Sequence, residues 1–448
     1  MLRYICPQSF KLEHYILYIT EKQRFYSMEK YIVNGGNPLY GDVEISGMKN
    51  AALPILIASI LTREKCTIEN LPKISDVKKT LDILTAMGAV VNDLGNGAVE
   101  IDSANVKGGI SPYSLVSKMR GSTYLIGAEL ACFGHAKVGW PGGCDFGQRP
   151  IDQHIKGFEA LGATVEIDAD EGFIYADADN GLHGNSVYFD VVSVGATINV
   201  MIAAVLAKGK TVIDNAAREP HIVDLANFFN TCGAKITGAG TSVIKIQGVE
   251  KLHGCTYAII PDMIEAGTYM AAVAAAGGKI NVKGIIPKHM ESVSAKLEEM
   301  GMTVTEYDDS ITIAKTKELK KIHIKTLPYP GFPTDMHPQL TAVLVCARGE
   351  SKVSEGVWEN RFRYVDELLK MGADIRVEGS SARIIGVGSL EGATVKAVDL
   401  RGGAAMIIAA LAAKGETVIT DIMSIERGYD DIVGKLTKLG ASIRIEND

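Results

Sequence analysis

A single thiol in a glycine-rich loop is the first feature of this sequence that suggests chemistry. Cys144 lies in the segment PGGCDFGQRP (141–150), five positions before Arg149. A thiol on such a loop can be exposed to solvent and can exchange a proton with a substrate. The alternative is an inert packing cysteine, which fits Cys132 and Cys346 because both lie in apolar stretches.

Polar and charged residues stand at the starts of several apolar segments that we expect to be helices. They are Lys49-Asn50, Arg120, Ser193-Val194, Asp262, Asp335 and Asp399-Leu400-Arg401. Free backbone N–H groups and the helix dipole make a helix start a good anion site. For Ser193, Asp262 and Asp399, simple N-capping is an equally good interpretation. A cation opposes the dipole, so Lys49, Arg120 and Arg401 indicate an anion supplied by a ligand, such as a phosphorylated substrate.

The elements that must position these residues form an internal repeat. A helix that ends in a hydrophobic residue and Gly, followed by a strand, recurs as MGAVV, LGATVEI, CGAKI, MGMTVTEY, MGADIRV and LGASIRI, about seventy residues apart. Glycine suits the end of a helix because it adopts a left-handed conformation without strain. Six such sites in near-register predict six copies of one helix-and-strand unit.

A second helix in most units is apolar and Ala-rich on every side. We predict such helices at 51–61, 195–207, 265–276 and 402–413. A helix without a polar face must be buried all round, whereas strands such as 164–168, 210–213 and 242–246 leave one face for solvent. The pattern predicts an α/β fold with helices inside and sheets outside, in two domains of three units, with a binding cleft between them.

Composition and charge exclude several classes of protein. The chain has 448 residues, of which 47% are hydrophobic and 22% charged, and a formal net charge of -7. These values indicate a folded, soluble protein and argue against nucleic acid or an acidic membrane as a partner, since both require a basic surface. No apolar run is long enough to span a bilayer, so we expect a cytoplasmic protein, and we interpret residues 1–27 as an N-terminal extension.

Other cofactor and metal chemistry has little support in the sequence. The seven cysteines show no CxxC spacing, and the nine histidines form no HxH or HExxH motif, so no disulfide framework or zinc site is predicted. There is no Walker A sequence. Two isolated histidines, His154 and His337, follow polar loops, where they could contact a ligand or play a purely structural part.

From about residue 28 to its end, the chain closely resembles the UDP-N-acetylglucosamine 1-carboxyvinyltransferase family. The motifs that carry the resemblance are, in order, ISGMKNAA (45–52), PGGC (141–144), RPIDQH (149–154), SVGAT (193–197), AREP (217–220), FPTDM (332–336), ENRF (359–362), DLR (399–401) and RGY (427–429). The resemblance implies an inside-out α/β fold of two domains. One domain comprises residues 28–49 and 262–448, and the other comprises residues 50–261. It also implies that an early strand near 31–46 belongs with the C-terminal domain.

The implied reaction moves the enolpyruvyl group of phosphoenolpyruvate onto the 3-hydroxyl of UDP-N-acetylglucosamine and releases phosphate. This is the first committed step of peptidoglycan synthesis, and it implies no metal or organic cofactor. By the same resemblance Cys144 is the acid and the target of fosfomycin, Asp335 accepts the sugar proton, Asn50 orients the intermediate and Asp399 assists late proton transfer. The implied phosphoenolpyruvate ligands are Lys49, Asn50, Arg149, Arg401 and Arg427, with Lys49, Asn50 and Arg427 also catalytic. The implied UDP-sugar ligands are Arg120, Arg149, Pro150, Ile151, Asp152, Gln153, Ser193, Val194, Asp335 and Val357.

Two rival functions remain at this stage. The sister enzyme 5-enolpyruvylshikimate-3-phosphate synthase shares the fold, but the Cys144 loop and the segment 149–154 favour the UDP-sugar. A catalytically silent UDP-sugar-binding paralogue is disfavoured by the presence together of Lys49, Cys144, Asp335, Asp399 and Arg427. One departure from the family pattern is Val191, where some relatives carry a lysine near the diphosphate, which leaves nucleotide affinity open. The oligomeric state is not predicted.

Overall fold

The computed structural model describes residues 29–447, apart from 110, 118, 141 and 143–149. The predicted N-terminal extension (1–27), Cys144 and Arg149 therefore lie outside the described residues. Within the described part of the chain no helix is both long and apolar enough to cross a membrane.

Six helices form the interior, and each begins one repeat. They are α2 (Lys49–Ala58), α5 (Tyr124–Phe133), α7 (Val194–Ala204), α9 (Met263–Ala276), α11 (His337–Val345) and α13 (Leu400–Ala412). Nearly every residue of α7, α9, α11 and α13 is buried, as their lack of a polar face predicts. Helix α2 packs on α5 and α5 on α7, while α9, α11 and α13 pack on one another.

Six amphipathic helices alternate with the inner ones. They are α3 (Ser75–Ala86), α6 (Asp152–Ala160), α8 (Pro220–Thr231), α10 (Glu291–Met300), α12 (Val365–Lys370) and α14 (Ile432–Lys438). The chain turns after each of them at a glycine with positive φ, at positions 88, 162, 233, 301, 372 and 440. The repeat predicted from these glycines is thus confirmed. The short helices are α4 (Tyr113–Val116), η1 (Ser59–Thr62), η2 (Arg120–Thr123), η3 (Pro287–Met290), η4 (Thr334–Met336) and η5 (Ile422–Ser424).

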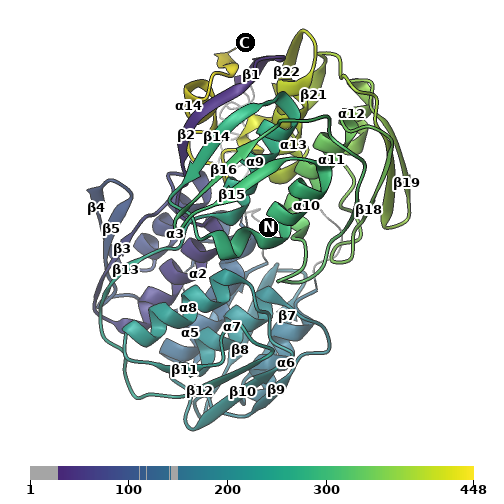
Figure 1. Ribbon diagram of the computed structural model, residues 1–448. Helices are drawn as coiled ribbons and strands as arrows, with labels where there is room; N and C mark the ends of the chain where they lie inside the picture. Colours follow the sequence, from purple (N-terminus) through teal and green to yellow (C-terminus); the bar gives the residue numbers. More distant parts are fainter. Residues whose placement is uncertain (1–28, 110, 118, 141, 143–149, 448) are drawn as a thin grey trace, which may run out of the picture.

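The strands of the described residues form six small sheets that cover the helices (Figure 1). In the lower lobe of Figure 1 the sheets are β13-β3-β5-β4 (Thr256–Ala258, Lys65–Glu69, Ala98–Asp102, Val90–Gly95), β6-β8-β7 (His135–Gly139, Phe173–Asp177, Thr164–Asp168) and β11-β12-β10-β9 (Lys235–Thr237, Val243–Gln247, Lys210–Asp214, Ser186–Tyr188). In the upper lobe they are β15-β16-β14-β2 (Thr303–Glu306, Ser310–Ala314, Gly278–Lys283, Leu39–Glu44), β17-β18-β20-β19 (His323–Lys325, Glu350–Ser354, Ser381–Ile385, Asp374–Glu378) and β21-β22-β1-β23 (Thr394–Lys396, Glu416–Thr420, Glu29–Asn34, Ser442–Asn447).

The expected single early strand is in fact two strands that join different sheets. Strand β1 pairs with β22 and β23, and β2 pairs with β14. Gly36, with a φ of 84°, lies between the two strands and breaks the extended chain. Both strands nevertheless pair only with strands from the C-terminal part of the chain.

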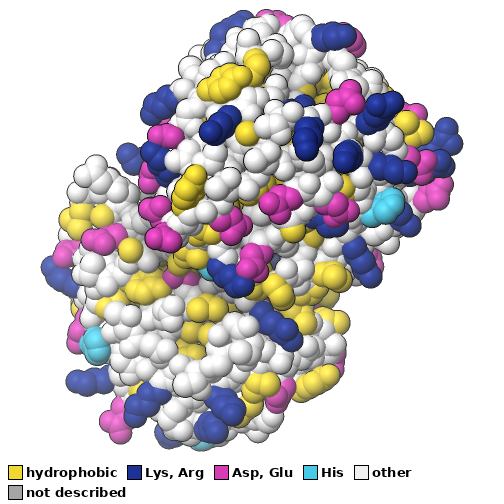
Figure 2. Space-filling model, in the orientation of Figure 1, with side chains coloured by type: hydrophobic (Ala, Val, Ile, Leu, Met, Phe, Trp, Pro, Cys, Tyr) yellow, Lys and Arg dark blue, Asp and Glu magenta, His cyan; other side chains and the backbone are white. Residues whose placement is uncertain are grey.

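The two passages between the lobes lie side by side. Met48 N–H donates to the carbonyl of Ile260 (2.7 Å), and Asp262 N–H donates to the carbonyl of Ser46 (2.9 Å). These bonds bring the starts of α2 and α9 together at the junction. The space-filling view shows the outline of the molecule narrowing between the lobes, with charged side chains on both sides (Figure 2).

Candidate active site at the junction of the two lobes

A buried carboxylate joins two of the predicted cations at the junction. Asp76, in the first turn of α3, lies with Oδ2 2.7 Å from Lys49 Nζ and Oδ1 3.1 Å from Arg427 Nε. Burial tends to raise the pKa of Asp76, but Lys49 and Arg427 outweigh it and lower that pKa below its usual value. The group is therefore an ionised carboxylate that fixes Lys49 and Arg427, 378 positions apart in the numbering, beside each other.

Lys49 stands among several positive charges. It is the first residue of α2 and is buried, and burial lowers the pKa of its ammonium group, while Asp76 opposes that shift. The charges of Arg427 and Arg401 lower the same pKa further. Lys49 and Arg427 share one carboxylate, and the charge of Arg401 acts on Lys49, so this buried region favours binding of a small, doubly charged anion.

Asp335 is held by two arginines on the upper-lobe side. Its Oδ2 lies 3.1 Å from Arg401 Nη2, and its Oδ1 lies 3.1 Å from Arg361 Nη2. Both guanidinium groups are buried, whereas about 31% of the Asp335 side chain is exposed. The carboxylate therefore sits at the surface of the junction with its orientation fixed from behind. Arg401 also lies over the ring of Tyr429, 5.4 Å from its centroid.

Three predicted residues act as N-caps in the structure. Ser193 Oγ accepts from Ala196 N–H, Asp262 Oδ1 from Ile264 and Glu265, and Asp399 Oδ1 from Arg401 and Gly402. Asp262 Oδ2 also accepts from the N–H of Lys49 at 3.4 Å. The capping interpretation is thus confirmed for all three, and the cap at Asp262 also ties the start of α9 to the start of α2.

Lys49 and Arg401 have anionic partners within the protein, and the expectation of a ligand anion beside them stays a prediction. Asp76 and Asp335 are their anionic partners in this structure. A cation in the first turn of a helix is therefore compensated by the protein itself, and a substrate anion would share or displace these contacts.

Most of the described residues predicted to bind a UDP-sugar lie in the lower lobe. The backbone N–H of Asp190 donates to Gln153 Oε1 at 2.9 Å. The side-chain amide of Gln153 donates in turn to Asp152 Oδ2 at 2.8 Å. Pro150 and Ile151 lead into α6, which packs on α7 behind Ser193 and Val194. Arg120 begins η2, on the N-terminal side of α5.

Val357 and Asn50 complete the predicted set within the described residues. Val357 is partly exposed in the upper lobe, and its N–H donates to Glu355 Oε1 at 2.7 Å. Asn50 follows Lys49 in the first turn of α2 and is partly buried. Because Asn50 directly follows Lys49, it lies at the same junction.

Sequence reasoning missed Asp76 and gave no role to Arg361. Asp76 is the second residue of an ordinary amphipathic helix, where an acidic residue is expected at the first turn. Arg361 lies within the motif ENRF, which was noted only as part of a resemblance. Its burial beside the partly exposed carboxylate of Asp335 becomes visible only in the fold.

The two isolated histidines have different surroundings. His337 is fully buried at the start of α11, with Nε2 3.2 Å from the hydroxyl of Tyr364, which supports a structural part. His154 is buried in α6, with Nδ1 3.0 Å from Asn199 Nδ2. Burial, aided by the charge of Arg120, lowers the pKa of His154 to about 3.

A pH dependence of stability follows from His154. The unfolded chain takes up a proton on this imidazole below its ordinary pKa of about 6.5, whereas the folded protein keeps it neutral. The contribution of His154 to the free energy of unfolding is therefore complete above pH 6.5 and is lost as the pH falls towards 3. Between pH 7 and pH 5 the free energy of unfolding should fall by about 2 kcal/mol. Urea unfolding at both pH values should show this loss in the wild type and a smaller loss in His154→Gln. His183→Gln, which changes an exposed histidine, is the matched control, and an unchanged loss in His154→Gln would contradict the assignment.

Comparisons with known proteins identify the family of this chain. The family model described as EPSP synthase (3-phosphoshikimate 1-carboxyvinyltransferase) matches residues 33–436. The UDP-N-acetylglucosamine 1-carboxyvinyltransferase 2 of Clostridium acetobutylicum is 57% identical over 420 residues, covering 94% of this chain and 100% of that protein. The chain belongs to the UDP-N-acetylglucosamine 1-carboxyvinyltransferase family. The corresponding enzyme 1 of Staphylococcus aureus is 51% identical over 423 residues, covering 94% of this chain and 100% of that protein.

Solved structures with the same fold are more distant in sequence. The enolpyruvyl transferase NikO from Streptomyces tendae superposes with a TM-score of 0.85 at 26% identity, over 94% of this chain and 100% of that one. An EPSP synthase from Acinetobacter baumannii superposes with a TM-score of 0.72 at 18% identity, with the same coverage. The predicted two-domain, inside-out α/β fold of the enolpyruvyl transferases is thereby confirmed.

Proposed function

We propose that this protein transfers the enolpyruvyl group of phosphoenolpyruvate to the 3-hydroxyl of UDP-N-acetylglucosamine and releases phosphate, as the first committed step of peptidoglycan synthesis. The observation that carries the proposal is the pairing, at one junction, of a cation cluster with an oriented carboxylate. Lys49, Arg401 and Arg427 form the cluster, and Asp335 is the carboxylate. Close relatives carry the name of this activity.

The reaction is an addition followed by an elimination. Carbon 3 of phosphoenolpyruvate gains a proton, carbon 2 becomes cationic, and the sugar 3-hydroxyl attacks carbon 2 as it loses its proton. In the second stage carbon 3 loses a proton and the C2–O bond to phosphate breaks, which restores the double bond. The site must therefore supply an acid, a base and fixed positive charge beside the phosphate and carboxylate.

Lys49, Arg427 and Arg401 supply the positive charge in this proposal. Asp76 holds Lys49 and Arg427 in one place before substrate arrives, so less ordering is needed on binding. Arg149, outside the described residues, is proposed as a further ligand of phosphoenolpyruvate. Asn50, beside Lys49, is proposed to orient the tetrahedral intermediate.

The proton-transfer roles fall to Asp335, Cys144 and Asp399. Asp335 is proposed to accept the proton of the sugar hydroxyl, because its carboxylate is oriented by two arginines and is partly open to solvent. Cys144, outside the described residues, is proposed as the acid. Asp399 uses one carboxylate oxygen as an N-cap and is proposed to assist the late proton transfer.

The nucleotide sugar is proposed to lie against the N-terminal ends of α5, α6 and α7. Its ligands there are Arg120, Arg149, Pro150, Ile151, Asp152, Gln153, Ser193 and Val194, with Asp335 and Val357 facing it from the upper lobe. At the start of α7 the backbone of Gly195 packs against the buried His154 ring, because an added Cβ would lie only 3.0 Å from His154 Nε2.

The strand pairing supports the proposed limits of the two domains. Strands β1 and β2 pair with C-terminal strands, and β13 returns to β3. We therefore propose domains at 28–49 plus 262–448 and at 50–261. A cytoplasmic location is proposed as well, because both substrates are intracellular metabolites.

Phosphate release tests the proposed function. Purified protein should release inorganic phosphate only when phosphoenolpyruvate and UDP-N-acetylglucosamine are both present. Shikimate 3-phosphate in place of the sugar nucleotide is the control for the sister enzyme, and it should give no release. Binding of UDP-N-acetylglucosamine without phosphate release would indicate a silent paralogue and overturn the proposal.

A further inference from the structure

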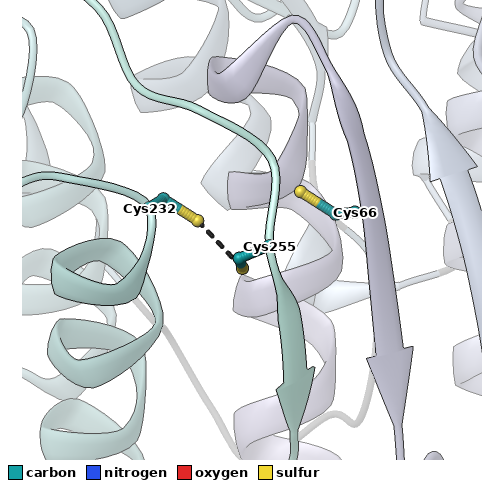
Figure 3. Close-up of side chains that lie close together, drawn as sticks. All are labelled: Cys66, Cys232 and Cys255. Carbon is teal, nitrogen blue, oxygen red and sulfur yellow. Dashed lines mark hydrogen bonds between the residues drawn. The ribbon is translucent and has the colours of Figure 1, made fainter.

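Three cysteine sulfurs converge in the lower lobe. Cys66 is the second residue of β3, Cys232 follows the last residue of α8, and Cys255 directly precedes β13. Their Sγ atoms all lie within 4.8 Å of one another, and those of Cys232 and Cys255 are 3.1 Å apart (Figure 3). The proposed reaction uses none of these thiols.

The backbone, and not only the side chains, holds the three cysteines together. Strand β13 runs parallel to β3, and Thr67 N–H donates to the carbonyl of Cys255 at 2.9 Å, which places Cys255 beside Cys66. His253 N–H donates to the carbonyl of Cys232 at 3.0 Å, which ties the end of α8 to the segment before β13. The cluster therefore forms wherever this lobe is folded.

Burial and ligand type suit one class of ligand. Cys66 and Cys232 have no exposed surface, whereas Cys255 is partly exposed and leaves a path to the sulfurs. Among the described residues no histidine or carboxylate joins the three sulfurs in this group. Thiolates are soft ligands that select Zn²⁺, Cu⁺ and similar ions over Mg²⁺ or Ca²⁺.

The spacing fits a metal ion at the centre of the three sulfurs. Zinc–sulfur bonds of about 2.3 Å in a tetrahedral site place two sulfurs roughly 3.8 Å apart. The 3.1 Å pair would open by a fraction of an ångström, and the widest separation in the cluster, at most 4.8 Å, would close by about one ångström at most.

We propose that Cys66, Cys232 and Cys255 form a structural site for a thiophilic metal ion, with Zn²⁺ as the expected occupant. A water molecule would complete the tetrahedron on the side of Cys255. The ion would cross-link the end of α8 to the sheet β13-β3-β5-β4, and so join the first and third repeats of this lobe. Because the unfolded chain does not bring the three sulfurs together, metal binding would stabilise the folded lobe.

Metal content and optical spectra test the proposal. The full-length protein, reduced and equilibrated with Zn²⁺, should retain about one ion per chain by elemental mass spectrometry, as expected for one site built from three thiolates and a water. Titration with Cd²⁺ or Cu⁺ in parallel arms should give a thiolate-to-metal charge-transfer band and show which ion binds most tightly. Cys66→Ser, Cys232→Ser and Cys255→Ser should each weaken zinc binding by more than about 100-fold, beyond what loss of an outer-shell partner causes.

Two controls assign the metal to this cluster. Cys346→Ser removes a cysteine at the end of α11 and should leave the zinc content unchanged, and Cys144→Ser should do so as well. Unchanged zinc content in the three cluster variants would overturn the proposal.

A measurement on the wild type covers the case in which the variants fail to fold. Alkylation followed by peptide mapping should find Cys255 protected when Zn²⁺ is present and reactive after chelation, with Cys346 indifferent to Zn²⁺. An alkylation rate of Cys255 that does not depend on Zn²⁺ would contradict the proposal. A Cys232–Cys255 disulfide would also protect Cys255 from alkylation, and peptide mass before reduction would detect it. If that disulfide accounts for the protection, the metal proposal is contradicted as well.

Discussion

Asp335→Asn is expected to lower the turnover number by about 10³-fold, within the range that general acid–base groups contribute. Asparagine has nearly the same shape, but its amide cannot take a proton from the sugar hydroxyl. Steady-state phosphate release at saturating substrates measures the effect. Calorimetry should show that UDP-N-acetylglucosamine still binds, because most of its proposed contacts lie on the lower lobe.

The same substitution also removes the negative charge between Arg361 and Arg401. Thermal unfolding must therefore accompany the kinetics, so that loss of folded protein is not mistaken for loss of catalysis. Asp366→Asn, which makes the same chemical change on an exposed position of α12, should leave the turnover number unaltered. A folded Asp335→Asn protein with nearly wild-type turnover would rule out Asp335 as the proton acceptor.

Lys49→Met is expected to lower kcat/KM for phosphoenolpyruvate by about 10³-fold, since one preorganised charge or donor contributes roughly 10²–10³ in rate. The Lys49 ammonium is buried and held 2.7 Å from Asp76, so water cannot replace it at low cost. Methionine keeps most of the side-chain volume and removes only the charge. The measurement is the initial rate as a function of phosphoenolpyruvate at saturating sugar nucleotide.

Lys79 offers a matched control for this substitution. Its ammonium also faces Asp76, at 3.7 Å, but it lies one turn along α3 and is more exposed than Lys49. Lys79→Met should change kcat/KM by less than about threefold, because Lys79 is partly exposed and its contact with Asp76 is the longer of the two. Equal effects of the two substitutions would mean that Asp76 needs only a nearby positive charge, and that Lys49 has no particular contact with substrate.

The sequence predicted the parts of the fold that depend on local pattern. Apolar, Ala-rich segments such as 402–413 could only be buried helices, and the glycines that follow the outer helices all take positive φ. The early strand was predicted less well, because the run from residue 31 to 46 is broken at Gly36 into two strands of different sheets.

The site was predictable where an unusual residue type marked it. Lys49 and Arg401 stood out because a cation at a helix start opposes the dipole. Asp76 did not, since an acidic residue there is ordinary, and its importance comes from a contact with Arg427 across the junction. Cys66, Cys232 and Cys255 likewise come from separate elements, and they meet only through the parallel pairing of β13 with β3 and the backbone bond from His253 to Cys232.

The identity of the product tests the central claim most directly. Protein incubated with phosphoenolpyruvate and UDP-N-acetylglucosamine should yield a sugar nucleotide heavier by one enolpyruvyl group, with NMR placing the vinyl ether on carbon 3 of the amino sugar. One phosphate should appear for each product molecule. Phosphate formed without this adduct, or an adduct formed on shikimate 3-phosphate instead, would contradict the account.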